Sequence, residues 1–479
     1  MVPVKAAIAA ERVACPDLGG EAADKTAWPL LKGERNWGSW RLGVALATAA
    51  AATWCYLIGE SVGYYLGFRQ GACALFGGSM IGMMIVTFAT LPICIRFGVD
   101  SLASTKPSFG SRGWVVPAVM QQLSVVGWNS VLLIFFAKSA TQLLIAMHAL
   151  PPGGSALVVP GTVLLACLLV FVFLQKGAHG LDRIARVLVA HVLVGVWMLY
   201  ILVTHRWAEL VGAVPVSASP DRVWNYTTGI EIGIISLLSW WPYIGAMVRM
   251  APDGRRAAIP VMIGMGMPVP LLSLIGIAGV LVLKVSDPAE WLRTVGGTAY
   301  GIVALLFVAA ANLGTASAGV YAAAIGLRHV PLLERVPWPA LLLITIAPVA
   351  AVGLFIPELF FAHFSALLGF VGMAFAPLCG IQITDYYLLR RRRIDIRALY
   401  TAGPQATYRF VGGFNPASLI AMAGGCAVYC ALLDPVSYKS HWPYDITTAS
   451  LPALVSAGLL HALATCLIVK PMGKGGYIP

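Results

Sequence analysis

Charged residues are scarce in this sequence: they make up 11% of its 479 residues, whereas hydrophobic residues make up 59% and the mean hydropathy is +0.82. A soluble domain carries about 25% charged residues, so this chain cannot cover itself with a hydrated surface. Charges are largely absent from long apolar runs, and a helix of about 20 such residues crosses the hydrocarbon core of a bilayer. The runs are continuously apolar and do not alternate, so they predict membrane-spanning helices and not the strands of a barrel.

Several signatures of other protein classes are also missing. The nine cysteines are odd in number and lie mostly inside apolar runs, which indicates small buried side chains and not a disulfide framework. The eight histidines are scattered, so the sequence predicts no metal cofactor and no membrane-embedded enzyme. No Walker-type phosphate loop supports an ATP-driven pump. The first 39 residues lack the apolar core of a signal peptide, and we interpret 1–39 as a cytoplasmic N-terminal tail.

Twelve apolar segments are long enough to span a bilayer. They lie at 40–66, 71–95, 114–148, 158–176, 184–204, 227–249, 259–284, 297–327, 337–357, 362–389, 413–433 and 448–469. Twelve spans place both termini on one side, and this alternation puts 25 of the 32 Lys and Arg residues there, 6 on the other side and Lys138 within a span. Because cytoplasmic loops carry the excess of Lys and Arg, we predict a multi-pass protein of a cell membrane, inner or plasma, with both termini cytoplasmic. The net charge of +12 then reflects the orientation of the chain in the membrane. We expect the protein to lie in a lipid bilayer as a monomer or weak oligomer, and to bind no nucleic acid.

Two spans contain residues that interrupt a helix. A run of small residues in the first span is followed by Gly59, Glu60 and Gly63, and the sixth span contains Pro242 directly after two tryptophans. Proline removes a backbone donor and clashes with the preceding turn. Broken helices at corresponding positions of two halves are typical of transporters with inverted repeats, with an ordinary proline kink as the alternative.

A series of short motifs follows the spans in order. The first is KPSFGSRGW at 106–114, with VGWN at 126–129 in the next span. The others are SWWPY at 239–243, APLCG at 376–380, TDYYLLRR at 384–391 and GFNPA at 413–417. Together, from about Asn36 to the C-terminus, they resemble the nucleobase:cation symporter-1 family, and the sixth-helix motif resembles its purine–cytosine permease branch.

The resemblance implies both a fold and a function. The fold is an all-α polytopic membrane protein of about 12 transmembrane helices, with a LeuT-like 5+5 inverted repeat plus two peripheral helices. The repeats would comprise 40–204 and 227–389, followed by a basic cytoplasmic connector at 390–412, two helices within 413–469 and a cytoplasmic tail at 470–479. The function is secondary active import of a small planar nitrogen heterocycle by alternating access, coupled to H⁺ or Na⁺. The ring would be a nucleobase such as cytosine or a purine, or a hydantoin-, allantoin- or vitamin-like ring; a same-fold symporter for an amino acid or other zwitterion is the alternative.

Tryptophans near the middle of the third and sixth spans are candidate substrate-binding residues. Trp128 is expected either to stack on a planar ring, which is worth about 1–3 kcal/mol for a base, or to pack in the core. Trp240 or Trp241 would form the opposite wall, and because neighbours on a helix point about 100° apart, the sequence leaves open which one. Relatives carry an amide one turn after the third-helix tryptophan, where this chain has Leu132. Asn129 is therefore a candidate for polar readout, with an interhelical hydrogen bond as the alternative.

The eighth span contains candidate ligands of a coupling cation. Relatives that bind Na⁺ place two adjacent hydroxyls here, whereas this chain has Gly314 followed by Thr315. Thr315 and Ser317 remain candidates, together with the backbone carbonyl of Ala50 beside the first-helix break, because hard cations take oxygen ligands. The missing hydroxyl puts a Na⁺ site in doubt.

Three further positions bear on the same region. Thr53, beside the first-helix break, is a candidate substrate contact. Asn312 is a candidate replacement for an asparagine that relatives carry later in the eighth span, where this chain has small and apolar residues. Ala246 stands where relatives with a similar sixth helix carry an aspartate. Other residues of this chain must therefore take the role that the carboxylate has in those relatives.

Ionisable groups within spans are costly to bury and are candidate functional residues. Glu60 and His191 are candidate proton carriers, with a solvated carboxylate and a core histidine as the alternatives. Lys138 is expected to snorkel outward or to pair with Glu60. We expect Glu231, at the start of the sixth span, to be interfacial, and Arg390–Arg393 to contact anionic lipid headgroups.

Overall fold

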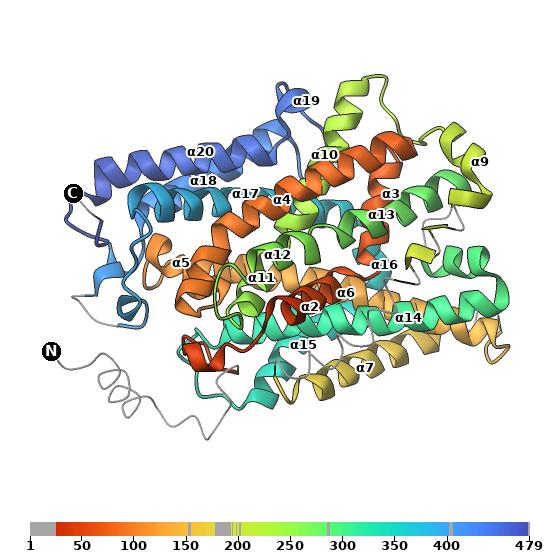
Figure 1. Ribbon diagram of the computed structural model, residues 1–479, viewed down its shortest axis with the longest axis horizontal. Coiled ribbons are helices and arrows are strands. Elements are labelled where there is room, and N and C mark those ends of the chain that lie inside the picture. The colour runs from red at the N-terminus through yellow and green to blue at the C-terminus, as the bar shows by residue number, and fades with distance from the viewer. Residues whose placement is uncertain are drawn as a thin grey trace.

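The computed structural model describes residues 25–151, 155–177, 193, 195–197, 199–200, 203–284, 288–401 and 406–477. Within these ranges the regular elements are helices, and strand-like pairing is limited to two isolated bridges. Most of the long helices run along the longest axis of the molecule (Figure 1). This arrangement is the one that apolar spans require, since each helix satisfies its own backbone hydrogen bonds.

The first half of the chain supplies a broken span and three long helices. Its elements are η2 (Lys32–Glu34), α2 (Ser39–Ala50), α3 (Trp54–Gly63), α4 (Phe68–Phe97), α5 (Ser101–Phe109), α6 (Val115–Ala146) and α7 (Ser155–Leu174). Helices α2 and α3 form the first predicted span and are bent by 58° at 51–53. Ala51, with φ −87° and ψ 81°, leaves the helical region. The predicted interruption of the first helix is therefore present.

The second half contains more irregular helices. Its elements are α9 (Trp207–Gly212), α10 (Arg222–Leu238), α11 (Trp241–Val248), α12 (Ala258–Gly264), α13 (Pro268–Ala278), η3 (Gly279–Leu283), α14 (Pro288–Leu327), α15 (Trp338–Phe355), α16 (Pro357–Ala362), α17 (Phe364–Ile383) and η4 (Thr384–Leu389). The sixth span is interrupted less than predicted. Ser239 and Trp240, between α10 and α11, keep right-handed helical angles. Pro242 occupies the first turn of α11, where a helix has no use for the missing N–H.

The chain ends in a pair of packed helices. The remaining elements are η5 (Arg397–Leu399), η6 (Thr407–Arg409), α18 (Pro416–Leu432), α19 (Tyr444–Thr447), α20 (Ser450–Ala464) and η7 (Thr465–Val469). Eleven of the twelve predicted spans have a counterpart among the described helices, and α7 and α18 are the shorter ones. The predicted span at 184–204, which includes His191, lies mostly outside the described residues.

The helices pack in pairs that are distant in sequence. Helix α14 lies along α6, α10 lies along α4, and α13 lies along α3. Glycines bring two of these backbones into direct contact. A Cβ on Gly59 of α3 would overlap the carbonyl of Ser273, and a Cβ on Gly276 of α13 would overlap that of Tyr56. Small residues allow such close approach between membrane helices, where packing replaces the hydrophobic effect as the driving force.

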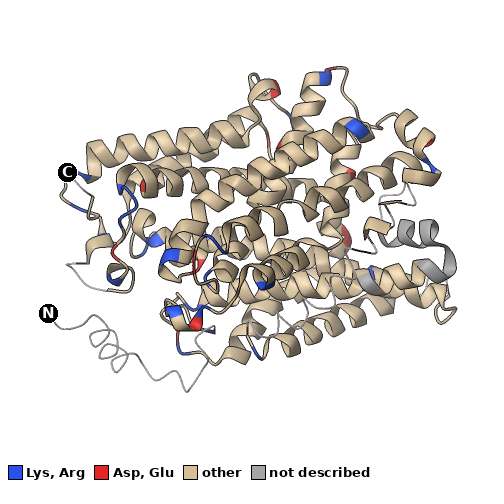
Figure 2. Cartoon of the chain, viewed as in Figure 1, with Lys and Arg blue, Asp and Glu red and all other residues tan. Residues whose placement is uncertain are grey.

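Basic residues gather at the end of the bundle where the C-terminus lies (Figure 2). Arg390 differs from the headgroup role predicted for it, because its side chain is 2% exposed. Its Nε donates to Asp385 Oδ2 at 2.7 Å, and its two terminal nitrogens donate to the carbonyls of Gly475 and Pro107. Arg391–Arg393 are exposed, and their contact with lipid headgroups stays a prediction.

Glu231 also differs from its predicted interfacial position. It is fully buried in α10, and its carboxylate accepts hydrogen bonds from Ser450 Oγ at 2.7 Å and from the backbone N–H groups of Ala449 and Ser450. The carboxylate therefore caps the N-terminus of α20, where a negative charge is favourable. The sixth and twelfth spans are joined through this cap.

Candidate functional site

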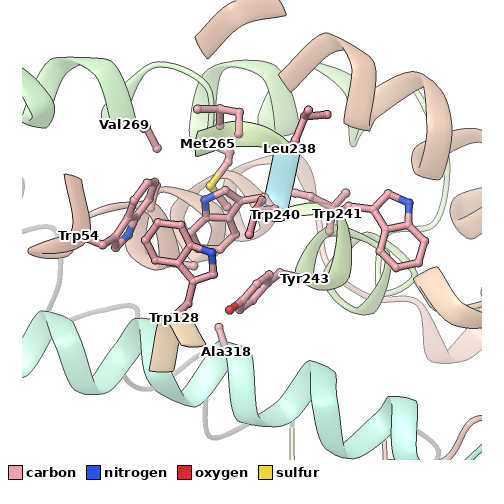
Figure 3. Packing of buried hydrophobic residues seen from close by; sticks show 14 of the residues in the cluster. Trp54, Trp128, Leu238, Trp240, Trp241, Tyr243, Met265, Val269 and Ala318 are labelled. Atoms are coloured by element: carbon pink, nitrogen blue, oxygen red, sulfur yellow. The ribbon is translucent and has the colours of Figure 1, made fainter. Parts of the chain in front are cut away.

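Three tryptophans from different spans meet beside the bend of the first helix. Trp54 is the first residue of α3, and its ring centroid lies 5.5 Å from that of Trp128 in α6 and 5.6 Å from that of Trp240. Trp240 in turn lies 4.7 Å from Tyr243 of α11. Figure 3 shows the four rings turned toward one another in the middle of the bundle. All four are at least 96% buried.

A small cavity lies among these rings. Besides the four aromatic residues, it is lined by Leu132, Ser239 and Thr315. Its volume is about 10 Å³, which is close to the minimum for one water molecule. None of the described residues that line it carries a charge. The cavity is thus an aromatic site that Trp54 nearly closes.

Of the two candidate sixth-helix tryptophans, only Trp240 lines this cavity. The indole of Trp241 points away from the other rings (Figure 3). Its Nε1 donates to Gln382 Oε1 at 2.6 Å, and its ring lies 5.7 Å from Phe375 of α17. Trp241 therefore connects the sixth span to the tenth.

Several polar atoms near the cavity have no hydrogen-bond partner among the described residues. They are Nε1 of Trp54 and Trp128, both amide atoms of Asn129, and Nδ2 of Asn312. Leaving a buried polar group unpaired costs about 1–3 kcal/mol, and such groups in native structures call for an explanation. The two indole N–H groups belong to side chains that line the cavity.

Asn129 faces α14 and does not line the cavity. A Cβ on Gly319 of α14 would lie 2.8 Å from Asn129 Nδ2 and 3.0 Å from the ring of Tyr243. The glycine therefore makes room for the amide between the third and eighth spans. Among the described residues, neither amide atom makes the hydrogen bond that the interhelical alternative requires, so both roles predicted for Asn129 stay predictions.

The eighth span holds the bend of the first helix through two side chains. Asn312 Oδ1 accepts hydrogen bonds from Thr53 N at 3.1 Å and from Thr53 Oγ1 at 2.8 Å. Thr315 Oγ1 donates to the carbonyl of Ala49 at 2.9 Å. Since the bend leaves backbone groups without helical partners, these contacts replace what the broken helix lost.

The other candidate ion ligands are also engaged within the protein. The carbonyl of Ala50 accepts from Cys55 Sγ at 3.0 Å and from Ala52 N at 3.1 Å. Ser317 Oγ donates to the carbonyl of Leu313, one turn earlier in its own helix. No group of three or more His, Cys, Asp or Glu residues suited to a metal ion occurs in the described part of the chain.

Glu60, one of the two candidate proton carriers, does not line the cavity. Glu60, half-buried in α3, accepts a hydrogen bond from Tyr64 OH at 2.7 Å. Lys138 Nζ lies 4.6 Å from the centroid of the Phe361 ring. His191 falls outside the described residues. Ala246 is buried in α11, where a carboxylate would have to be desolvated.

The sequence analysis did not single out Trp54, Tyr243 and Ser239 as site residues. The signal available for Trp54 was its place directly after a run of small residues that ends in a bend. Tyr243 was part of the sixth-helix motif but carried no separate prediction. The bend of the first helix and the junction between α10 and α11 place these side chains at the cavity.

Comparison with known proteins agrees with this architecture. A family model described as "Permease for cytosine/purines, uracil, thiamine, allantoin" matches residues 29–447. The chain belongs to this family. The predicted resemblance is thereby confirmed, and the family is one of transporters and not of enzymes.

Individual relatives of this family member are distant in sequence. The purine-uracil permease NCS1 of Arabidopsis thaliana is 23% identical over 394 residues, which cover 77% of this chain and 64% of the plant protein. The chain therefore spans less than two thirds of that relative's length.

Solved structures resemble the chain in fold. Mhp1, a nucleobase-cation-symport-1 family transporter in a closed conformation with bromovinylhydantoin bound, is 21% identical with a TM-score of 0.77, covering 93% of this chain and 96% of Mhp1. A Na⁺-coupled sialic acid symporter is 10% identical with a TM-score of 0.61, covering 94% and 93%. At these identities the likeness establishes the fold, and the predicted LeuT-like architecture is confirmed.

Proposed function

We propose that the protein is a secondary active transporter that imports a small planar nitrogen heterocycle by alternating access between two five-helix repeats, 40–204 and 227–389. The observation that carries this proposal is the meeting of Trp54, Trp128 and Trp240 at the bend of the first helix. Indole faces bind planar rings by stacking, at about 1–3 kcal/mol per ring for bases. In this proposal both termini lie in the cytoplasm, because the basic loops lie on their side.

The substrate in this proposal stacks between Trp128 and Trp240. Because a cavity of about 10 Å³ does not admit a heterocycle, the indole of Trp54 must withdraw from between the two walls. Trp54 directly follows the bend at 51–53, so a change of the bend angle moves it. The observed arrangement would then be a closed state of the site without substrate.

The polar groups at the cavity support recognition of an uncharged substrate. The indole N–H groups of Trp54 and Trp128 lack acceptors among the described residues and suit the carbonyl oxygens or ring nitrogens of a heterocycle. An amino acid would instead require partners for its carboxylate and ammonium groups. The described lining offers no charged side chain, so we favour the heterocycle over the zwitterion.

For the coupling ion we propose H⁺. A hard cation needs several free oxygen ligands, whereas the carbonyls of Ala49 and Ala50 already accept hydrogen bonds from Thr315 and Cys55. This chain also has Gly314 where Na⁺-binding relatives carry a second hydroxyl. Glu60, hydrogen-bonded to Tyr64 in the second half of the first span, is the proposed proton carrier, with His191 as a second candidate.

The test is uptake of a panel of labelled nucleobases and related rings by cells that express the protein. We expect uptake of at least one ring, unchanged when Na⁺ is replaced by choline and abolished by a protonophore. Glu60→Gln should lower proton-driven accumulation while leaving exchange of substrate across the membrane. Competition by amino acids but by no heterocycle would overturn the substrate class, and dependence on Na⁺ alone would overturn the coupling ion.

A further inference from the structure

A second, larger cavity lies on the basic side of the bundle and shares no lining residue with the aromatic site. Its volume is about 740 Å³, within the range of about 300–1,000 Å³ typical of small-molecule sites. Its walls come from four parts of the chain: 26–28, the segment 106–115 that includes the end of α5, the turn 328–334 after α14, and residues 399–401 and 409–414 before α18. We call it the basic-side cavity.

The lining of the basic-side cavity carries an excess of positive charge. Lys106, Arg112, Arg328 and Arg409 line it, against the single carboxylate of Glu334. Several cations that share one concave wall repel one another and raise the local concentration of anions. The charge balance therefore indicates an anionic occupant.

Lys106 is a buried cation of this lining. Its side chain is 92% buried, yet its ammonium makes no hydrogen bond or ion pair within the described part of the chain. It lies over two rings, 4.8 Å from the centroid of Tyr400 and 5.8 Å from that of Trp114. Burial lowers the pKa of Lys106 to about 8, although Asp100 and Glu334 oppose this. A buried cation without a hydrogen-bonded counter-ion is costly, and an anion bound beside it in the cavity would lower that cost.

Arg112 is placed by the backbone of a neighbouring turn. Gly413 has φ +101°, a conformation that favours glycine, and a Cβ there would come within 2.6–2.8 Å of the aliphatic carbons of Arg112. The N–H groups of Arg112 and Gly113 donate to the carbonyl of Gly413 at 2.8 and 3.0 Å. Arg409, on the same turn, is exposed like Arg112. Arg112 and Arg409 thus belong to two segments that backbone hydrogen bonds join at Gly413. Both line the cavity together with Lys106.

We propose that the basic-side cavity binds the phosphate group of an anionic ligand, supplied either by a soluble organic phosphate or by a lipid headgroup. Guanidinium groups match phosphate oxygens with paired N–H donors, and lysine adds a compact positive charge. Because the walls come from four separate segments, a bound phosphate would link the loops that follow the second, eighth and tenth spans. The site is independent of the transport site and does not require that the protein carry a heterocycle.

The test uses the full-length purified protein in nanodiscs of zwitterionic lipid. One arm titrates inorganic phosphate and adenosine monophosphate, and a second arm replaces part of the lipid with phosphatidylglycerol. Thermal unfolding and calorimetry are the readouts. We expect saturable stabilisation in at least one arm, and the arm that responds identifies the source of the phosphate.

Three variants separate this site from a general charge effect. Lys106→Met, which keeps the apolar contacts with the rings, should weaken phosphate binding at least tenfold without lowering the unfolding temperature of the ligand-free protein. Arg112→Gln should weaken it as well and serves if the first variant does not fold. Arg255→Gln, an exposed arginine outside the cavity, should leave it unchanged. Absence of binding in both arms, or equal binding by all variants, would overturn the proposal.

Discussion

Replacing Trp128 with leucine tests the stacking site directly. Leucine keeps an apolar side chain but removes the aromatic face, so the loss should equal the stacking contribution of about 1–3 kcal/mol. At 1.4 kcal/mol per tenfold change, the substrate KM should rise between roughly 5-fold and 150-fold. Trp128→Phe, which retains a smaller face, should lose less. Uptake kinetics of the responsive heterocycle, measured over a range of concentrations, give this ratio.

Trp241→Leu is the matched control for that experiment. Trp241 is also buried and also contributes an indole from the bundle interior, but it points toward Gln382 and away from the cavity. Both leucine variants remove a buried aromatic ring, so both should lower the unfolding temperature, since large-to-small changes at such sites cost several kcal/mol. Only Trp128→Leu should change KM. An unchanged KM in Trp128→Leu, or an equal rise in both variants, would refute the stacking argument.

Three further predictions concern buried hydrogen bonds. Asn312→Leu removes the acceptor of two hydrogen bonds from Thr53 and should lower stability by about 2 kcal/mol; an unchanged unfolding temperature would contradict this. Glu231→Ala should destabilise the protein by about 1–3 kcal/mol, because the N-terminus of α20 loses its buried cap, while KM of the folded fraction stays the same. His329 donates Nε2–H to Asp100 at 2.9 Å. Burial lowers the pKa of His329 although Asp100 opposes this. The neutral imidazole therefore stabilises the fold fully above about pH 6.5, the pKa of an unperturbed histidine, and this stabilisation is lost on acidification. The unfolding temperature should therefore fall more steeply between pH 7.5 and 5.5 in the wild type than in His329→Asn, and parallel curves would count against the assignment.

The sequence predicted the features that are local in the chain. Apolar runs predicted the spans, and the small residues before Gly59 predicted the break in the first helix. The break in the sixth was overestimated. Pro242 falls in the first turn of α11, where its missing N–H costs nothing, so Ser239 and Trp240 stay helical.

The features that the sequence missed depend on contacts between distant segments. Glu231 lies at the start of a span, which indicates an interfacial residue, but the N-terminus of α20 covers it from 219 positions away. Arg390 belongs to a run of four arginines, and only the folded chain brings Asp385 and the carbonyl of Pro107 to it. Trp54 enters the aromatic site because of the 58° bend, whose direction no local pattern gives.

The close approach of α3 and α13 at Gly59 and at Gly276 has a mechanical consequence. Because neither glycine has a side chain, the backbones of α3 and α13 approach each other directly. Sliding one helix along the other would bring its carbonyl groups into overlap with the opposing backbone. We therefore expect α3 and α13 to move as one rigid unit about the bend at 51–53. If the first span moves during the proposed transport cycle, we expect α13 to move with α3 relative to Trp128 and Trp240. We expect Gly276→Ala to push the two helices apart, because its Cβ would overlap the carbonyl of Tyr56.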